Sequence, residues 1–181
     1  MKVRISESNS VDFLSSACFC LAKNYEQALS LINELSETQY NFSNKNSSSI
    51  GAHLRHVIER AELCFKAYEQ QSVLLDYDAR ERDLALETRP ELAQQKLVEF
   101  INFLADLAPQ ELARQITVKE SISTDIQTEV SSTFARELLE QINHNVHHFA
   151  LIKLIALELQ IVLPADFGKA FATQIYEQQQ N

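Results

Sequence analysis

Glycine and proline are scarce in this sequence. The chain of 181 residues contains two glycines, Gly51 and Gly168, and three prolines. The phosphate-binding loops of P-loop and dinucleotide-binding proteins need several closely spaced glycines, so both classes are excluded. Few glycines and prolines also mean few tight turns, which predicts long helices.

The sequence also lacks a long hydrophobic run and an excess of basic residues. No apolar stretch reaches the roughly 18 residues that span a bilayer, and the start of the chain, MKVRISESNSVDF, has no apolar core of a secretory signal. The formal net charge is −9 at pH 7, whereas binding to nucleic acids or anionic membranes needs a basic surface. We therefore expect a cytoplasmic protein that binds neither nucleic acid nor membranes.

Cysteine is present in an odd number. Cys18, Cys20 and Cys64 form no C-x-x-C pair, and in a cytosolic chain such cysteines are reduced thiols rather than disulfides. All three fall in helical patterns, so we expect them to fill the core.

Hydrophobic residues recur at three- and four-residue steps through most of the chain, as amphipathic helices require. The patterns predict helices over residues 10–36, 49–70, 89–107, 131–160 and 167–178. The stretch TQYNFSNKNSSS between the first two reads as a polar loop whose serines cap the next helix. Thr88 with Glu91 fits a capping box for the third helix, which we expect to stop near Pro109.

One segment differs from this helical pattern. RQITVKESISTDIQTEV is rich in isoleucine, valine and threonine, which predicts extended chain and a small hairpin near residues 115–128. The remaining pattern indicates an all-α protein with a single domain over residues 1–181. We expect an antiparallel four-helix bundle with a short C-terminal helix, and such bundles build metal sites from side chains on facing helices.

All five histidines lie in two short windows, in the second and fourth predicted helices. His144 and His148 are four residues apart, so their side chains share a helix face and can reach one metal ion. His147 lies about 100° further round the helix from His148, although it can pair with His144 at three-residue spacing. A third histidine from a facing helix would complete a three-histidine site with an open coordination position, the catalytic type of zinc site.

The second helix offers His53 and His56 for this third position. His53 lies at the edge of the apolar face, and His56 lies further round, in line with Arg60. Periodicity alone favours His53. The alternative for all five histidines is an ordinary structural role, at the surface or hydrogen-bonded in the core.

Other motifs for chemistry are weaker. The sequence has no nucleophile elbow and no H-E-x-x-H motif. Asp76, Asp78, Glu81 and Asp83 form an acidic group, but they lack the spacing and the glycine of an EF-hand. We interpret them as a solvated connector, and a place at the mouth of the histidine site is the alternative.

The order of the histidines resembles the DinB-like superfamily of four-helix proteins. In that family a histidine on the second helix precedes a later helix that commonly carries H-x-x-H-H-R-G-Q, and NHNVHHFALI matches this motif over residues 144–148. The segments SIGAHLRHVIER, LLDYDARERDLALE and LPADFGKAFAT are also similar to an uncharacterised bacterial subgroup of it.

The resemblance implies metal ligands at His144 and His148. Its second-helix ligand falls on His56, which precedes Val57 and Glu59, rather than on His53. The motif and the amphipathic pattern therefore disagree, and the motif is preferred. The family's Arg-Gly-Gln after the double histidine is replaced here by residues 149–151, Phe-Ala-Leu.

The resemblance also implies a function. Characterised relatives include metal-dependent transferases that use low-molecular-weight thiols, so it implies a divalent metal, zinc or nickel, a small-molecule substrate and a homodimer. Glu59, Tyr77 and Asp78 are candidates for acid–base or supporting groups near the site. The alternative is a noncatalytic metal-binding or sensing domain.

Overall fold

Helices dominate the computed structural model, which describes residues 7–45, 47–108, 110 and 112–180, with side chains from residue 14 onward. The elements in chain order are α1 (Glu7–Glu34), α2 (Glu37–Tyr40), α3 (Ile50–Glu69), β1 (Leu74–Asp76), α4 (Leu84–Thr88), α5 (Pro90–Ala105), β2 (Gln115–Ser121), β3 (Gln127–Thr133), α6 (Phe134–Glu158) and α7 (Phe171–Gln180). The predicted mostly helical class is confirmed. The predicted stop at Pro109 lies outside the described residues.

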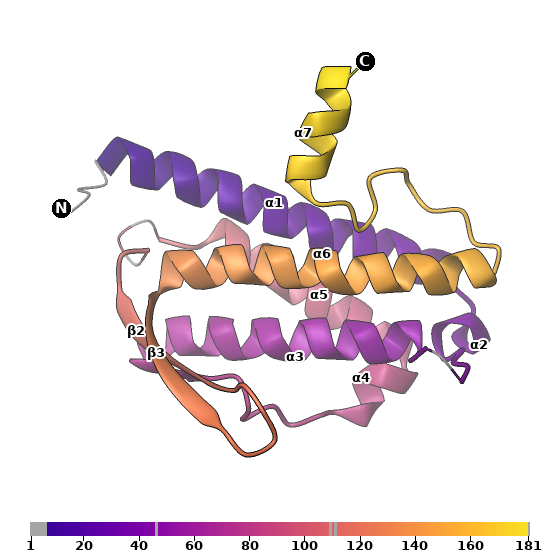
Figure 1. Cartoon of the computed structure of the whole chain (residues 1–181), viewed down its shortest axis with the longest axis horizontal. Coiled ribbons are helices and arrows are strands. Elements are labelled where there is room, and N and C mark those ends of the chain that lie inside the picture. The colour runs from indigo at the N-terminus through magenta and orange to yellow at the C-terminus, as the bar shows by residue number, and fades with distance from the viewer. Residues whose placement is uncertain (1–6, 46, 109, 111, 181) are drawn as a thin grey trace.

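The four long helices α1, α3, α5 and α6 lie side by side (Figure 1). Helix α1 packs against α5 and α6, and α3 packs against the same two helices. Each helix therefore presents its apolar face to two neighbours, which is how amphipathic helices bury that face.

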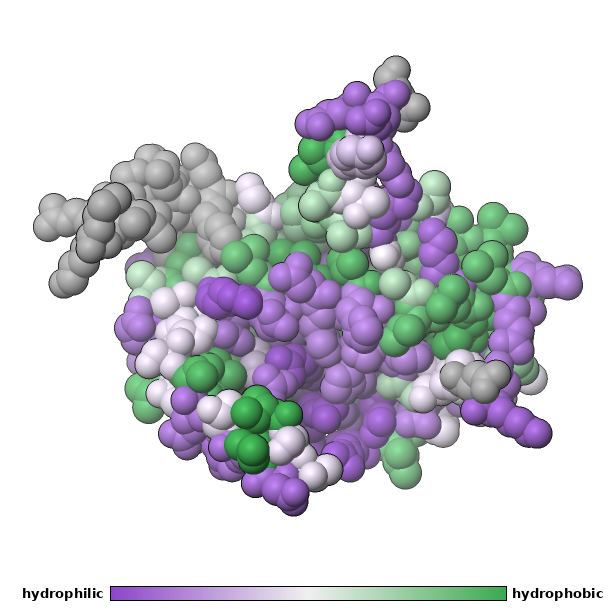
Figure 2. All heavy atoms as spheres, in the orientation of Figure 1, coloured by the Kyte–Doolittle hydropathy of each residue, from purple (hydrophilic) through white to green (hydrophobic). Residues whose placement is uncertain are grey.

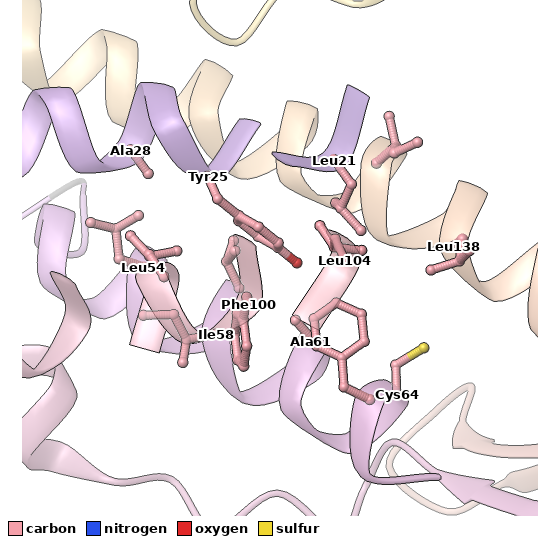
Figure 3. Packing of buried hydrophobic residues seen from close by; sticks show 14 of the residues in the cluster. Leu21, Tyr25, Ala28, Leu54, Ile58, Ala61, Cys64, Phe100, Leu104 and Leu138 are labelled. Atoms are coloured by element: carbon pink, nitrogen blue, oxygen red, sulfur yellow. The ribbon is translucent and has the colours of Figure 1, made fainter. Parts of the chain in front are cut away.

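The core is filled by side chains from all four of these helices (Figure 3). Leu21, Leu54 and Leu138 have no exposed surface, and the rings of Tyr25 and Phe100 pack with centroids 5.6 Å apart. Full burial of such a side chain contributes about 1.5–3 kcal/mol. Packing of these core side chains therefore holds α3 and α6 in fixed positions relative to each other.

The three cysteines are free thiols, as predicted. Cys64 is fully buried in the core, and burial raises its pKa well above the ordinary range. Cys18 and Cys20 are only partly buried against the core. The prediction that the cysteines fill the core is therefore confirmed in full for Cys64 and in part for the other two.

A three-stranded sheet lies at one end of the long helices (Figure 1). Strands β2 and β3 form an antiparallel hairpin in which Val118 lies opposite Val130. Strand β1 pairs in parallel with β2, and Leu75 lies opposite Val118. The predicted hairpin is present and extends to Thr133, but the third strand makes the all-α prediction wrong in this respect.

The connector between α3 and α5 contains two short elements, β1 and α4. Thr88 ends α4, and its hydroxyl donates to the carbonyl oxygen of Leu84 at 3.0 Å. The predicted capping box of α5 is therefore wrong: the residue before α5 is Arg89, which makes no side-chain cap. Glu91 instead pairs with Arg89, with Oε1 2.7 Å from Nε.

The segment between α1 and α3 also contains a helix that the polar pattern did not predict. Ser36 and Gln39 form the reciprocal capping box of α2, in which Gln39 N–H donates to Ser36 Oγ at 3.2 Å. Helix α1 ends at Glu34 because the chain turns into this cap. Ser49 caps α3 by accepting from Ala52 N–H at 2.9 Å, so the predicted role of the loop serines is confirmed.

Helix α7 projects away from the other helices (Figure 1), and none of its side chains is buried. It begins at Phe171, later than the predicted residue 167. Phe167 lies before it, almost fully buried, and its ring stacks on Phe149 with centroids 5.1 Å apart. Gly168 then turns the chain with φ of 64°, a conformation that favours glycine.

We predict that Gly51→Ala destabilises the protein. A Cβ at Gly51 would overlap the carbonyl oxygen of Glu87 and lie 2.5 Å from Tyr40 Cε1. Overpacking of this kind costs about 1–3 kcal/mol, measurable as a lower free energy of unfolding in urea. Ser30→Ala, at an exposed position of α1, is the control and is expected to change stability little. Equal stability of Gly51→Ala and the wild type would contradict the prediction.

Candidate metal centre

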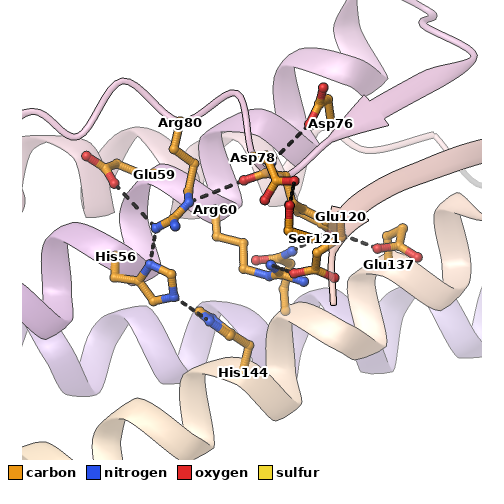
Figure 4. A network of polar contacts seen from close by, with 12 residues as sticks. His56, Glu59, Arg60, Asp76, Asp78, Arg80, Glu120, Ser121, Glu137 and His144 are labelled. Atoms are coloured by element: carbon orange, nitrogen blue, oxygen red, sulfur yellow. Dashed lines mark hydrogen bonds and ion pairs between the residues drawn. The ribbon is translucent and has the colours of Figure 1, made fainter. Parts of the chain in front are cut away.

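Three histidines from two helices converge between α3 and α6. His56 projects from α3, His144 and His148 project from α6, and one potential ligand atom from each lies within 4.8 Å of the other two. His56 Nε2 and His144 Nε2 are 3.1 Å apart (Figure 4). Two nitrogens bound to one tetrahedral zinc ion lie about 3.3 Å apart, given bond lengths of about 2.0–2.1 Å. The three imidazoles therefore fit a shared divalent ion.

His53 and His147 lie beside this cluster. His53 Nδ1 is 3.0 Å from His148 Nδ1, so in a neutral pair one ring donates and the other accepts. A hydrogen bond of this kind fixes the tautomer and the orientation of a ligand histidine. His147 is exposed and packs edge-on against the His148 ring, with centroids 5.1 Å apart. The structure thus brings both histidines of α3 to the pair on α6: His56 contacts His144 and belongs to the three-histidine group, whereas His53 contacts His148.

The cluster is electrically neutral near pH 7. Burial, followed by the nearby charge of Arg80, lowers the pKa of His56 to about 4. Burial and the neighbouring histidines lower the pKa of His144 to about 2 and that of His148 to about 3. Neutral imidazole is the form that binds metals, so the three rings need lose no proton before binding.

Two arginines lie against the histidines. Arg80, from the connector between β1 and α4, contacts His56 Nδ1 and also lies 3.8 Å from Glu59 Oε2 (Figure 4). Arg60, one helical turn after His56, pairs with Glu120 at 2.6 Å. The cluster therefore adjoins two arginines, each of which has an acidic partner.

A buried polar network lies next to the histidines. The Tyr77 hydroxyl donates to Glu137 Oε2 at 2.8 Å and accepts from Gln141 Nε2 at 3.0 Å. The Arg60 guanidinium lies over the Tyr77 ring, with Cζ 3.6 Å from the centroid. Burial raises the pKa of Tyr77 far above its ordinary value. Tyr77 is thus a structural hydrogen-bonding group rather than an accessible acid or base.

The acidic connector is tied to the sheet and to α4. Asp76 pairs with Lys119 at 3.0 Å, and Asp78 accepts hydrogen bonds from two hairpin side chains, which lower its pKa. Asp83 caps α4, and Glu81 is exposed. The residue that this connector brings to the histidines is Arg80, which the sequence pattern did not identify.

The position that follows the double histidine is part of the core. Phe149 is fully buried and stacks on Phe167. The family's arginine at this position is therefore replaced by a packing residue, and the guanidinium nearest His56 comes from Arg80, on a different element.

The molecular surface near α3 and α6 is mainly polar. Figure 2 shows hydrophilic side chains across the middle of the face on which both helices run, and hydrophobic ones towards the end of α6. Leu154 and Leu157 at that end are exposed by 64% and 65%. A separate hollow of about 510 Å³, lined by α1 and residues 162–167, contains no histidine. Within the described residues, no helix is long and apolar enough to cross a membrane.

The fold and the histidine cluster define a mostly helical protein with a candidate centre for a divalent metal. The family model described as the DinB superfamily matches residues 21–152, well over half of the chain, and the protein belongs to that superfamily. The match includes all five histidines, and it confirms the resemblance drawn from the motif. Membership and the three-histidine cluster together support a divalent metal in general.

The chain is also similar to part of a fungal protein. It is 29% identical over 102 residues to "FK506-binding protein 5" of Rhizopus delemar, which covers 55% of this chain. The matched part is 26% of the length of that relative. No solved structure matches this chain.

We predict that the metal-free protein loses stability when the pH falls below about 6.5, the ordinary pKa of histidine. The folded-state pKa values of His56, His144 and His148 lie between about 2 and about 4. Between pH 6.5 and 4 the unfolded chain therefore binds more protons, and unfolding becomes easier. Urea unfolding with a chelator present at pH 7, 6 and 5 measures this.

The variant His144→Gln is expected to flatten this pH dependence, because it removes one of the buried imidazoles. His147→Gln, at an exposed position outside the cluster, serves as the control. A pH dependence that is the same in the wild type and in His144→Gln would contradict the prediction.

Proposed function

We propose that this protein holds one divalent metal ion at His56, His144 and His148 and acts as a metal-dependent transferase that uses a low-molecular-weight thiol. The observation that carries the proposal is the convergence of three neutral imidazoles, with ligand atoms within 4.8 Å of one another. Three protein ligands leave a coordination position open, as in catalytic zinc sites. Imidazole ligands suit both zinc and nickel, and we propose one of these two.

The protein residues would hold and orient this centre. A divalent ion bound there would lower the pKa of a thiol or a water in the open position. His53 would hold the ring of His148 through the contact between their Nδ1 atoms at 3.0 Å. The three candidate ligands are only partly buried, so a small molecule can approach them. Glu59, 4% exposed, is an acidic group beside this arrangement, 3.8 Å from the Arg80 guanidinium that contacts His56.

We further propose that the four long helices form an antiparallel bundle of the DinB-like type, within a single domain over residues 1–181. We also propose a cytoplasmic location and no nucleic-acid or membrane partners; the net charge of −9 supports the absence of such partners. A homodimer is proposed from the family, and the exposed hydrophobic side chains at the end of α6 are consistent with it.

The second candidate function is a noncatalytic metal-binding or sensing domain. It is favoured by the position of the cluster, because His56 lies on α3 and the other two histidines lie on α6. A metal ion at this position would link two helices of the core, and its binding energy would add to the stability of the fold.

We predict one divalent ion per chain in untagged protein. Single substitutions His56→Ala, His144→Ala and His148→Ala are expected to abolish binding or weaken it by at least about tenfold, since each removes a ligand. His147→Ala is the control and should retain the ion. Elemental analysis and zinc titration measure both results. Binding that survives in all three variants would exclude this site.

The thiol-transfer proposal has its own test. The zinc- or nickel-loaded protein is assayed with a panel of low-molecular-weight thiols and small electrophiles. We expect turnover that falls by at least about a hundredfold in His144→Ala and remains in His147→Ala. If metal binds but no thiol is consumed, and chelation lowers the melting temperature, the noncatalytic function is supported instead.

A further inference from the structure

Arg80 determines which nitrogen of His56 carries the proton. Its guanidinium Nη1 contacts His56 Nδ1 (Figure 4). A guanidinium can only donate hydrogen bonds in proteins, so His56 Nδ1 must accept. In a neutral imidazole the proton then resides on Nε2.

This tautomer conflicts with metal binding at the cluster. His56 Nε2 is the atom that faces His144 Nε2 at 3.1 Å, and a neutral histidine binds a metal through its unprotonated nitrogen. Ligation through Nε2 therefore requires the proton to move to Nδ1, where it would oppose the N–H group of Arg80. The Arg80 contact and ligation by His56 are mutually exclusive.

Glu59 offers a hydrogen-bond acceptor for the proton on His56 Nδ1. It lies three residues after His56 on α3, and residues so spaced share a helix face. Its Oε1 accepts from Asp83 N–H at 2.7 Å, whereas its buried Oε2 has no hydrogen-bond partner among the described residues. A buried carboxylate oxygen without such a partner is costly. A metal-bound histidine commonly donates its other N–H to a carboxylate.

Arg80 has room to leave His56. Its side chain is 21% exposed, and it lies in the segment that joins β1 to α4, where Arg82 has a φ of 57°. Withdrawal towards solvent would break the hydrogen bond from Arg80 Nε–H to the Tyr77 carbonyl oxygen, at 3.3 Å, and the ion pair with Glu59.

We propose that Arg80 and the metal compete for His56, and that Glu59 is the positioning residue that accepts a hydrogen bond from His56 Nδ1–H once the metal has displaced Arg80. One proton moves from Nε2 to Nδ1 through solvent, with no net uptake or release. This inference rests on the metal centre proposed above, and it identifies the groups that set the affinity of that centre.

The first test uses the wild-type protein. Nitrogen-15 NMR of histidine-labelled protein distinguishes the two tautomers of each ring. With chelator present, His56 is expected to carry its proton on Nε2; after zinc addition the proton is expected on Nδ1. A His56 ring protonated on Nδ1 in the metal-free protein would overturn the inference. His56→Gln assigns the signal.

The second test measures zinc affinity by competition with a chelating dye. Arg80→Gln is expected to bind zinc roughly tenfold more tightly, because no hydrogen bond to a charged donor must be broken. Glu59→Gln keeps the acceptor oxygen for Asp83 N–H but turns an NH2 group towards His56, which cannot accept a hydrogen bond from Nδ1–H, and should weaken binding by about tenfold or more. Arg82→Gln, an exposed position in the same segment, removes the same charge and is expected to change affinity by less than about threefold.

The outcomes separate this inference from the proposed function. If the wild type binds zinc through its histidines but Arg80→Gln has unchanged or weaker affinity, the competition is refuted and the metal centre stands. If Arg80→Gln binds zinc more tightly but the His56 tautomer of the wild type is the same with and without zinc, Arg80 acts only through its charge. This result also refutes the competition. If no protein binds either zinc or nickel, both proposals fail. Circular dichroism of each variant confirms folding, and the wild-type NMR result needs no variant.

Discussion

The packing of α6 against α3 is the contact on which the rest of the structure depends. Helix α6 also buries polar side chains, Glu137, Gln141 and Asn145, which are at most 5% exposed. Buried polar groups need hydrogen-bond partners to offset the cost of leaving water. Glu137 obtains them from the sheet and its connector: Ser132 donates to Oε1 at 2.5 Å, and the Tyr77 hydroxyl donates to Oε2. The small sheet is therefore needed to complete a polar interior, and it also carries the connector to the histidines.

The long helices could be predicted from the sequence because each of them repeats its apolar face over several turns. The short elements could not. Strand β1 has three residues and α4 has five, too few to show a period. Strand β1 is instead defined by distant pairing, in which Leu75 lies opposite Val118. The capping pair at Thr88 and Glu91 failed for a related reason, since the local pattern does not reveal that Thr88 already ends another helix.

The histidine pair on α6 was predictable from spacing, whereas the partner on α3 was not predictable from amphipathic phase. That phase assumes an apolar interior, and it placed His56, in line with Arg60, towards solvent. Arg60 is in fact only 7% exposed, because it pairs with Glu120 of β2 and its guanidinium lies over the Tyr77 ring. The family motif points to His56, which lies 3.1 Å from His144, and its role as a metal ligand stays a prediction. No local pattern could have identified Arg80, which reaches the cluster from a connector without regular periodicity.

The balance of charge around the cluster bears on the kind of ligand it would accept. Arg60 pairs closely with Glu120, at 2.6 Å, whereas Arg80 lies 3.8 Å from Glu59 and is the looser pair. Each arginine thus has an acidic partner, and three neutral imidazoles add no charge. A divalent ion held there would keep its two positive charges, and in a partly buried site such charge strongly favours an anionic ligand. A thiolate and a hydroxide both satisfy this requirement, so the electrostatics of the cluster favour an anionic nucleophile, and the proposed thiol supplies one when it ionises.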